Sequence, residues 1–197
     1  MTFDELVAEV YEITNRPDLE SETKSAIKAA TLKAHKTDFY SKDIFETGIE
    51  FDSADYRQSL DYVTLFSNFR AFKYFRRVED ETDDVGKFIA IISPDELLDA
   101  YGANRADIAY VAGRVLEIRS SVTFSKALLG CYVLPIVTPE EAYRSWVAEQ
   151  APYYIIHEAC RKIFRSIGQM DEASGQRELV AEELILLKQS GLTDVGY

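Results

Sequence analysis

The stretch IAYVAGRVLEIR, residues 108–119, decides the fold class. Its two halves, residues 108–111 and 115–119, consist mainly of apolar side chains, with the β-branched and aromatic types that are typical of strands. Gly113 stands between the halves, and glycine accepts the positive φ angles that tight hairpin turns need. The stretch therefore predicts a β-hairpin in the middle of the chain.

Further strands are predicted on both sides of this hairpin. Residues 59–66 alternate between two sets of side chains, which indicates a strand with two different faces. Other short runs rich in apolar or aromatic residues lie at 71–78, 88–92 and 127–137. Because these runs are short and closely spaced, we expect an antiparallel sheet. The sequence lacks alternating strand–helix–strand units, which argues against a doubly wound nucleotide-binding fold.

The two ends of the sequence have helical patterns instead. Thr2 and Glu5 form a capping-box pattern, and apolar residues then recur at helical spacing as far as Ile13. Further helices are expected at about 21–36, from Thr138, from Pro152 to Gly168 and at about 172–189.

The predicted fold class is therefore α+β. Each predicted helix has one apolar face, so each needs a partner that covers this face. We expect residues 1–37 and 138–190 to form a helical bundle, with residues 38–137 as an inserted antiparallel β region. Residues 191–197 are expected to be a flexible C-terminal tail.

The composition narrows the classes of function. The 197 residues carry a net charge of −12, with 34 acidic and 22 basic side chains, and the sequence pI is about 4.7. A protein that grips nucleic acid by its phosphates needs a basic patch, so a dedicated DNA-binding role is disfavoured. Two cysteines, no visible signal peptide and no apolar run of about 20 residues predict a soluble protein made in a reducing cytoplasm, with no membrane partner.

Few residues have the partners that catalysis or metal binding needs. His35 lies in a Lys-rich helix and is expected on its solvated side. His157 and Cys160 are three residues apart on one helix and could pair as base and nucleophile, but Cys160 also belongs to the apolar stripe. We therefore expect no catalytic, cofactor-binding or metal-binding residues, and no cofactor.

Two charged runs have ordinary explanations. The acidic run at 80–84 lacks the glycine and glutamate that a calcium loop needs at its sixth and twelfth positions, so a solvated loop is the better interpretation. The run at 70–77 mixes basic and aromatic residues, as single-strand nucleic-acid binders do. Alternation along a strand explains this run equally well, and we favour the strand.

The C-terminal half has a layout that resembles a known family. The hairpin at 108–119 is followed by GCYVLP at 130–135, Trp146 and the helix PYYIIHEACRKIF at 152–164, and then by a Glu-rich helix. The earlier runs DYVTL at 61–65 and KYFR at 73–76 fit the same layout. Over nearly the whole chain the pattern resembles the head-to-tail adaptor (connector) proteins of tailed bacteriophages, of the podovirus tail tubular protein A type.

The resemblance implies a structural virion protein rather than an enzyme. Such a subunit docks under the portal protein as a ring of its own copies, commonly twelve, and joins the head to a tail or nozzle protein. It lies at the head–tail junction of the virion, where DNA passes through the ring without specific binding. The family's C-terminal segments often reach onto the portal. In this chain the corresponding residues would be Lys188, Gln189, Leu192, Val195 and Tyr197.

Two other classes of function remain open from the sequence. One is an acidic protein–protein interaction module, such as an inhibitor that mimics the charge of DNA, although acidic residues are spread along the whole chain. The other is a small hydrolase built on Cys160 or on carboxylates.

Overall fold

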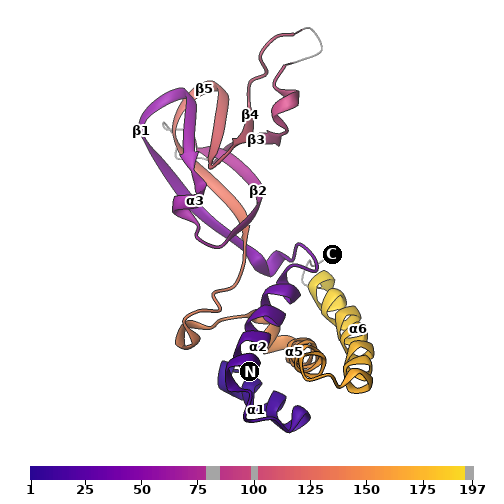
Figure 1. Ribbon diagram of the computed structural model, residues 1–197. Helices are drawn as coiled ribbons and strands as arrows, with labels where there is room; N and C mark the ends of the chain where they lie inside the picture. The colour runs from indigo at the N-terminus through magenta and orange to yellow at the C-terminus, as the bar shows by residue number, and fades with distance from the viewer. Residues whose placement is uncertain (79–84, 99–101, 194–197) are drawn as a thin grey trace. The chain divides into compact units, whose positions relative to one another are not determined.

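The computed structural model describes residues 1–78, 85–98 and 102–193 (Figure 1). The chain divides into two compact units, one made of Met1–Asp43 with Leu134–Tyr197, the other of Ile44–Val133. The first unit is helical and the second contains the sheet.

The helical unit brings together helices from both ends of the sequence. These are α1 (Phe3–Thr14), α2 (Glu20–His35), α4 (Trp146–Gln150), α5 (Pro152–Ser166) and α6 (Met170–Thr193), with the 3-10 turns η1 (Ser41–Asp43) and η3 (Glu140–Ala142). The predicted capping box is confirmed: Thr2 Oγ1 accepts a hydrogen bond from the Glu5 amide, and the Glu5 carboxylate accepts one from the Thr2 amide.

Helix α5 is the centre of this unit. It packs against α1, α2, α4 and α6, and its side chains are buried on several faces because each neighbour covers a different one. Leu6 and Val10 of α1 and Ile27 of α2 meet Ile156 and Ile163 in the same fully buried cluster. Burying an aliphatic side chain of this size stabilises the fold by about 1.5–3 kcal/mol.

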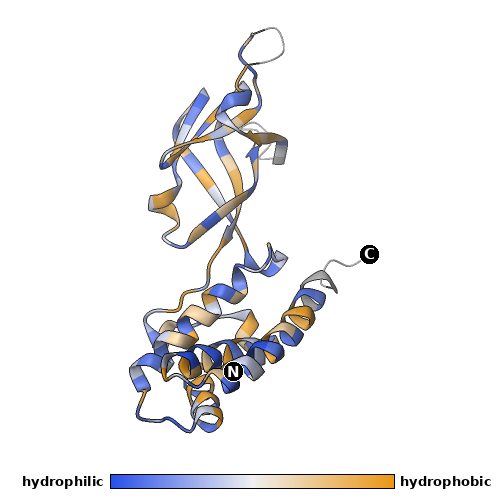
Figure 2. Ribbon diagram, turned by 45° about the vertical axis from the view of Figure 1, so that its right-hand side comes forward, coloured by the Kyte–Doolittle hydropathy of each residue, from blue (hydrophilic) through white to orange (hydrophobic). Residues whose placement is uncertain are grey.

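Helix α6 buries only a narrow stripe against α5. Ala173, Val180 and Leu187 are buried and lie seven residues apart, which is the spacing of a seam between two helices. Other apolar residues of α6 remain exposed, among them Leu179, Ile185 and Leu186. Figure 2 shows hydrophobic and hydrophilic segments interspersed along this helix.

The second unit is a closed barrel of four strands with one strand added. Its elements are β1 (Ile44–Asp61), α3 (Tyr62–Leu65), β2 (Phe69–Val78), β3 (Val85–Ile92), the 3-10 turn η2 (Pro94–Glu96), β4 (Ile108–Ala112) and β5 (Val115–Val133). β5 pairs with β1 along one edge and with β2 and β4 along the other, while β3 bridges β2 and β4. The pairings β5-β2-β3-β4-β5 therefore close on themselves. The inner side chains include Phe75, Phe124 and Leu129, which are almost fully buried.

The predicted fold class, a helical bundle of both chain ends with an inserted antiparallel β region, is wrong. The β region is a closed barrel with its own core, and β3 pairs with β4 in parallel rather than antiparallel. The local sequence pattern identifies strands but not the strands with which they pair. It therefore could not show that the 19-residue β5 pairs with β1, β2 and β4. The hairpin itself is confirmed: Ile108 pairs with Arg119, and Gly113 has a φ of 65°.

Three predicted boundaries are also wrong. Only residues 59–61 of the run at 59–66 lie in a strand, at the end of β1, because Asp61 then caps the short helix α3 by accepting a hydrogen bond from the Thr64 amide. No α-helix starts at Thr138; η3 is a single 3-10 turn, and the next helix begins at Trp146. Helix α6 continues past Gly191 to Thr193, and residues 194–197 of the predicted tail lie outside the described residues.

Candidate functional site

A buried cluster of polar side chains links α2, η1 and the start of α4. The Nδ1 atom of His35 lies 2.7 Å from Oδ1 of Asp43, and its Nε2 atom lies 2.9 Å from Oγ of Ser145. The indole nitrogen of Trp146 donates to the same Asp43 oxygen at 2.7 Å. Only 2% of the surface of His35, 5% of Asp43 and 6% of Ser145 is exposed. The prediction that His35 is solvated is therefore wrong.

Local structure places each member of this cluster. His35 is the last residue of α2, and Asp43 ends η1, where its amide bonds the Tyr40 carbonyl. Ser145 is the N-cap of α4, and its Oγ accepts a hydrogen bond from the Ala148 amide at 3.3 Å. The Trp146 ring then packs edge-on against His35 and Tyr40. Sequence reasoning missed the cluster because His35 and Ser145 lie 110 residues apart in the sequence.

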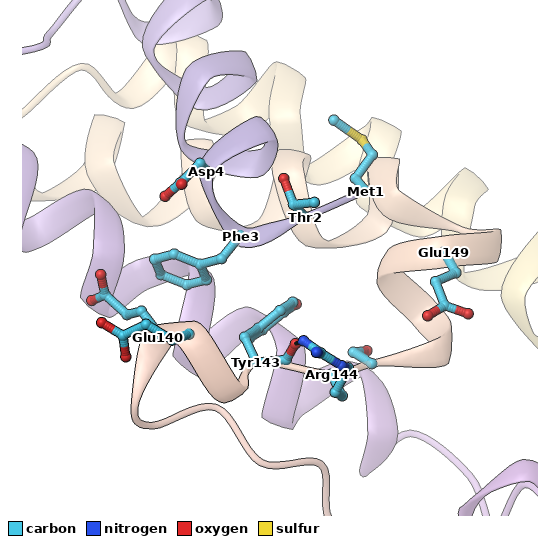
Figure 3. Close-up of a pocket in the computed structure, with 10 residues that line it drawn as sticks. Met1, Thr2, Phe3, Asp4, Glu140, Tyr143, Arg144 and Glu149 are labelled. Atoms are coloured by element: carbon cyan, nitrogen blue, oxygen red, sulfur yellow. Dashed lines mark hydrogen bonds between the residues drawn. The ribbon is translucent and has the colours of Figure 1, made fainter.

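The order Asp43–His35–Ser145 is that of a serine nucleophile with its base and orienting carboxylate. With a proton on Nδ1 donated to Asp43, Nε2 of His35 would accept the Ser145 hydroxyl proton. Ser145 also lines a pocket of about 540 Å³, together with Met1, Phe3 and other residues around η3 and α4 (Figure 3). The arrangement therefore has the connectivity of a catalytic triad, although the same bonds also cap α4 and tie three chain segments together.

The pair predicted as an alternative nucleophile, His157 and Cys160, is not formed. Nδ1 of His157 bonds the side-chain oxygen of Gln176 at 2.8 Å, and no hydrogen bond joins it to Cys160 within the described ranges. Burial raises the pKa of the Cys160 thiol to about 12, which disfavours the reactive thiolate. Burial likewise raises the pKa of Cys131 to about 11.

The basic-aromatic run lies on strand β2, as the favoured interpretation predicts. The Arg76 guanidinium lies over the Phe88 ring at 4.3 Å from its centroid, and Arg77 bonds Asp107 and Ser120 at 3.0 Å. These basic groups are engaged within the barrel unit. The acidic run at 80–84 lies outside the described residues.

The residues expected to reach the portal lie at or beyond the end of α6. Lys188 and Gln189 are exposed on the helix, and Leu192 belongs to its last turn. Val195 and Tyr197 lie outside the described residues. The sequence pattern placed Ile185 on the packing face of this helix together with Leu179, Leu184 and Leu187, but Ile185 is 59% exposed. Its neighbour Leu186, which the pattern did not single out, is 55% exposed.

Comparison with known proteins adds no family: no protein-family model and no curated protein matches this sequence. Over the described part of the chain, no group of three or more His, Cys, Asp or Glu side chains could hold a metal ion. Among the helices of that same part, none is both long enough and apolar enough to cross a membrane.

Proposed function

We propose that this chain is a structural virion protein, a head-to-tail adaptor that forms a ring between portal and tail around the DNA channel. The exposed apolar end of α6 is the observation that carries the proposal. Ile185 and Leu186 are large aliphatic side chains, more than half exposed, just before the C-terminal segment. Exposed apolar groups of this kind favour contact with another protein, and here they adjoin the residues assigned to portal docking.

The charge of the chain supports the same role. A channel wall must let DNA pass without holding it, and a net charge of −12 repels phosphates. The downstream tail or nozzle protein would then dock on another surface of the ring. We expect negligible affinity for duplex DNA at physiological salt. Tight binding that weakens steeply with added salt would contradict the proposal, because it would reveal a phosphate-binding surface.

Association with the portal protein of its own phage tests the proposal directly. Purified wild-type chain should bind the portal ring, as seen by electron microscopy and sedimentation. Ile185→Glu should weaken binding by about tenfold or more, because burying an unpaired carboxylate is costly. Met170→Glu is the matched control, since Met170 is 61% exposed at the opposite end of the same helix. Failure of the wild-type chain to bind the portal would refute the adaptor function.

A second candidate, a serine hydrolase, is favoured by the Asp43–His35–Ser145 order and by the pocket that Ser145 lines. A fluorophosphonate probe distinguishes the two functions, since it labels only activated serines. Labelling of the wild-type chain that is lost in Ser145→Ala and in His35→Gln would establish the hydrolase. If the folded chain is not labelled, the Asp43–His35–Ser145 cluster has a structural role and the hydrolase function is refuted.

A further inference from the structure

Helix α6 has two faces of different character. Ala173, Val180 and Leu187 form the stripe that packs on α5 (Figure 1). Consecutive residues of an α-helix are turned by about 100°, so residues two positions from Val180, and those five or six positions beyond it, lie on the opposite side. This side is called the outer face of α6. It contains the exposed residues Glu178, Glu182, Ile185 and Leu186.

The outer face carries large apolar side chains that the fold leaves exposed. Ile185 and Leu186 are 59% and 55% exposed, and Leu179, at the margin of this face, is 39% exposed. Leu179 and Leu186 are seven residues apart, so the three side chains form an aliphatic ridge about two helical turns long. A ridge of this kind is the element by which an amphipathic helix enters an apolar groove of another protein.

Acidic side chains border this ridge. Glu182 lies three residues before Ile185 and four before Leu186, so it is the neighbour of both on the helix surface. Glu178 lies four residues before Glu182, and like charges at this spacing destabilise a helix. Among the described residues, neither glutamate forms an ion pair that would offset this repulsion. The two carboxylates are therefore available to basic groups of another protein.

The basic residues of α6 lie off the outer face. Arg177 precedes Val180 by three residues and Lys188 follows it by eight, which places both about 60–80° from the packed stripe. Glu172 and Glu183 lie at similar angles on the other flank, so the charges of the two flanks balance. The outer face has no such balance. Its charged residues within the described part of α6 are all acidic: Asp171, Glu178 and Glu182.

We propose that the outer face of α6 docks into a groove of its partner that has an apolar floor and a rim of lysine or arginine side chains. The aliphatic ridge calls for the apolar floor. Carboxylates with no cation among them call for a basic rim, because like charges placed opposite each other across an interface repel. The inference rests on the proposed function in taking the partner to be the portal protein, and it states the surface chemistry that the portal must present.

Binding kinetics of the full chain on the portal ring test floor and rim separately. Glu182→Gln removes a rim charge, so association should slow by about threefold and depend less on salt, with little change in dissociation. Glu182→Lys reverses the charge and should weaken affinity by about tenfold or more. Ile185→Ala shortens the ridge and should instead speed dissociation, with the salt dependence unchanged. Surface plasmon resonance at about 50 and 300 mM NaCl measures these rates.

Glu12→Lys is the matched control, since Glu12 is an exposed acid on α1 and its replacement changes the net charge by the same amount as Glu182→Lys. Its affinity for the portal should stay within about twofold of wild type. Circular dichroism confirms that each variant is folded. Portal binding that neither Glu182 substitution changes, or that Glu12→Lys weakens equally, overturns the basic rim and leaves the adaptor function standing. Absence of portal binding by the wild-type chain refutes the adaptor function, and the inference with it.

Discussion

The Nδ1 atom of His35 lies 2.7 Å from Oδ1 of Asp43, with both side chains almost fully buried, so the end of α2 is joined to η1 by a hydrogen bond shielded from water. Trp146 donates to the same carboxylate oxygen, and Ser145 meets the other imidazole nitrogen. His35, Asp43 and Ser145 are buried and Trp146 is half-buried, so water has little access to the hydrogen bonds between them. Removing one member therefore leaves at least one hydrogen bond of its buried neighbours unmade.

Asp43→Ala is therefore expected to lower the free energy of unfolding by about 1–3 kcal/mol for each donor that it leaves without an acceptor, His35 and Trp146. His35→Ala should cost a comparable amount. Urea denaturation followed by circular dichroism measures both. His157→Ala is the control, because His157 is only partly buried, bonds the neutral Gln176 side chain and stacks on the exposed Tyr153 ring; its cost should stay near ~1 kcal/mol. Equal costs for the two histidines would contradict a structural role for the His35 cluster.

Ionisation of Glu158 should make a measurable contribution to the way the free energy of unfolding changes with pH. Burial of this carboxyl opposes its ionisation, but hydrogen bonds from Arg161 and Lys33 outweigh burial and hold its pKa below the usual value. Its contribution to stability is therefore complete above the unfolded pKa of about 4.3 and is lost as the pH falls through the lower folded pKa.

Glu158→Gln should accordingly destabilise the fold at pH 7 by about 3 kcal/mol, since it breaks a buried ion pair. The difference in free energy of unfolding between wild type and variant should narrow as the pH falls from 5 towards 3. Denaturation curves at a series of pH values check this. Glu178→Gln, an exposed substitution on α6, should follow wild type at every pH. If this difference stayed constant with pH, the negative charge of Glu158 would not be the cause of the destabilisation.

Local signals in the sequence determined which parts of this fold could be predicted. The capping box of Thr2 and Glu5 and the turn at Gly113 depend on a few neighbouring residues, and both are found where they were predicted. The closed barrel depends instead on β5 pairing with strands far away in the sequence, which no local pattern encodes. His35 shows the same limit: its helix contains many lysines, yet partners 8 and 110 residues away bury it.

Neither cysteine should react readily in the folded protein. Burial raises the pKa of Cys131 to about 11 and that of Cys160 to about 12, so almost no thiolate exists at pH 8. Reaction with Ellman's reagent at pH 8 should be slow without denaturant and should complete rapidly, for two thiols, in concentrated urea. One thiol that reacted at once in the native state would reopen the case for a cysteine nucleophile.

Gly130 is required where Tyr74 crosses strand β5. The two residues are paired across β2 and β5, and a Cβ atom at position 130 would lie 2.5 Å from the Tyr74 ring. The ring has little freedom to move, because its hydroxyl donates to the Glu46 carboxylate and its edge meets Phe88. Gly130→Ala should therefore cost about 1–3 kcal/mol through overpacking. Gly48→Ala is the control, since a Cβ there meets nothing within 4 Å.

A double substitution separates this contact from the intrinsic effect of glycine in a strand. In a Tyr74→Ala background the ring is gone, so Gly130→Ala should cost less than about 0.5 kcal/mol and could even stabilise the strand, because alanine has less freedom to lose on folding than glycine. The coupling between the two substitutions, obtained from four denaturation curves, should then be about 1–3 kcal/mol. If Gly130→Ala costs the same with and without the Tyr74 ring, the contact with the ring is not the reason for glycine at this position.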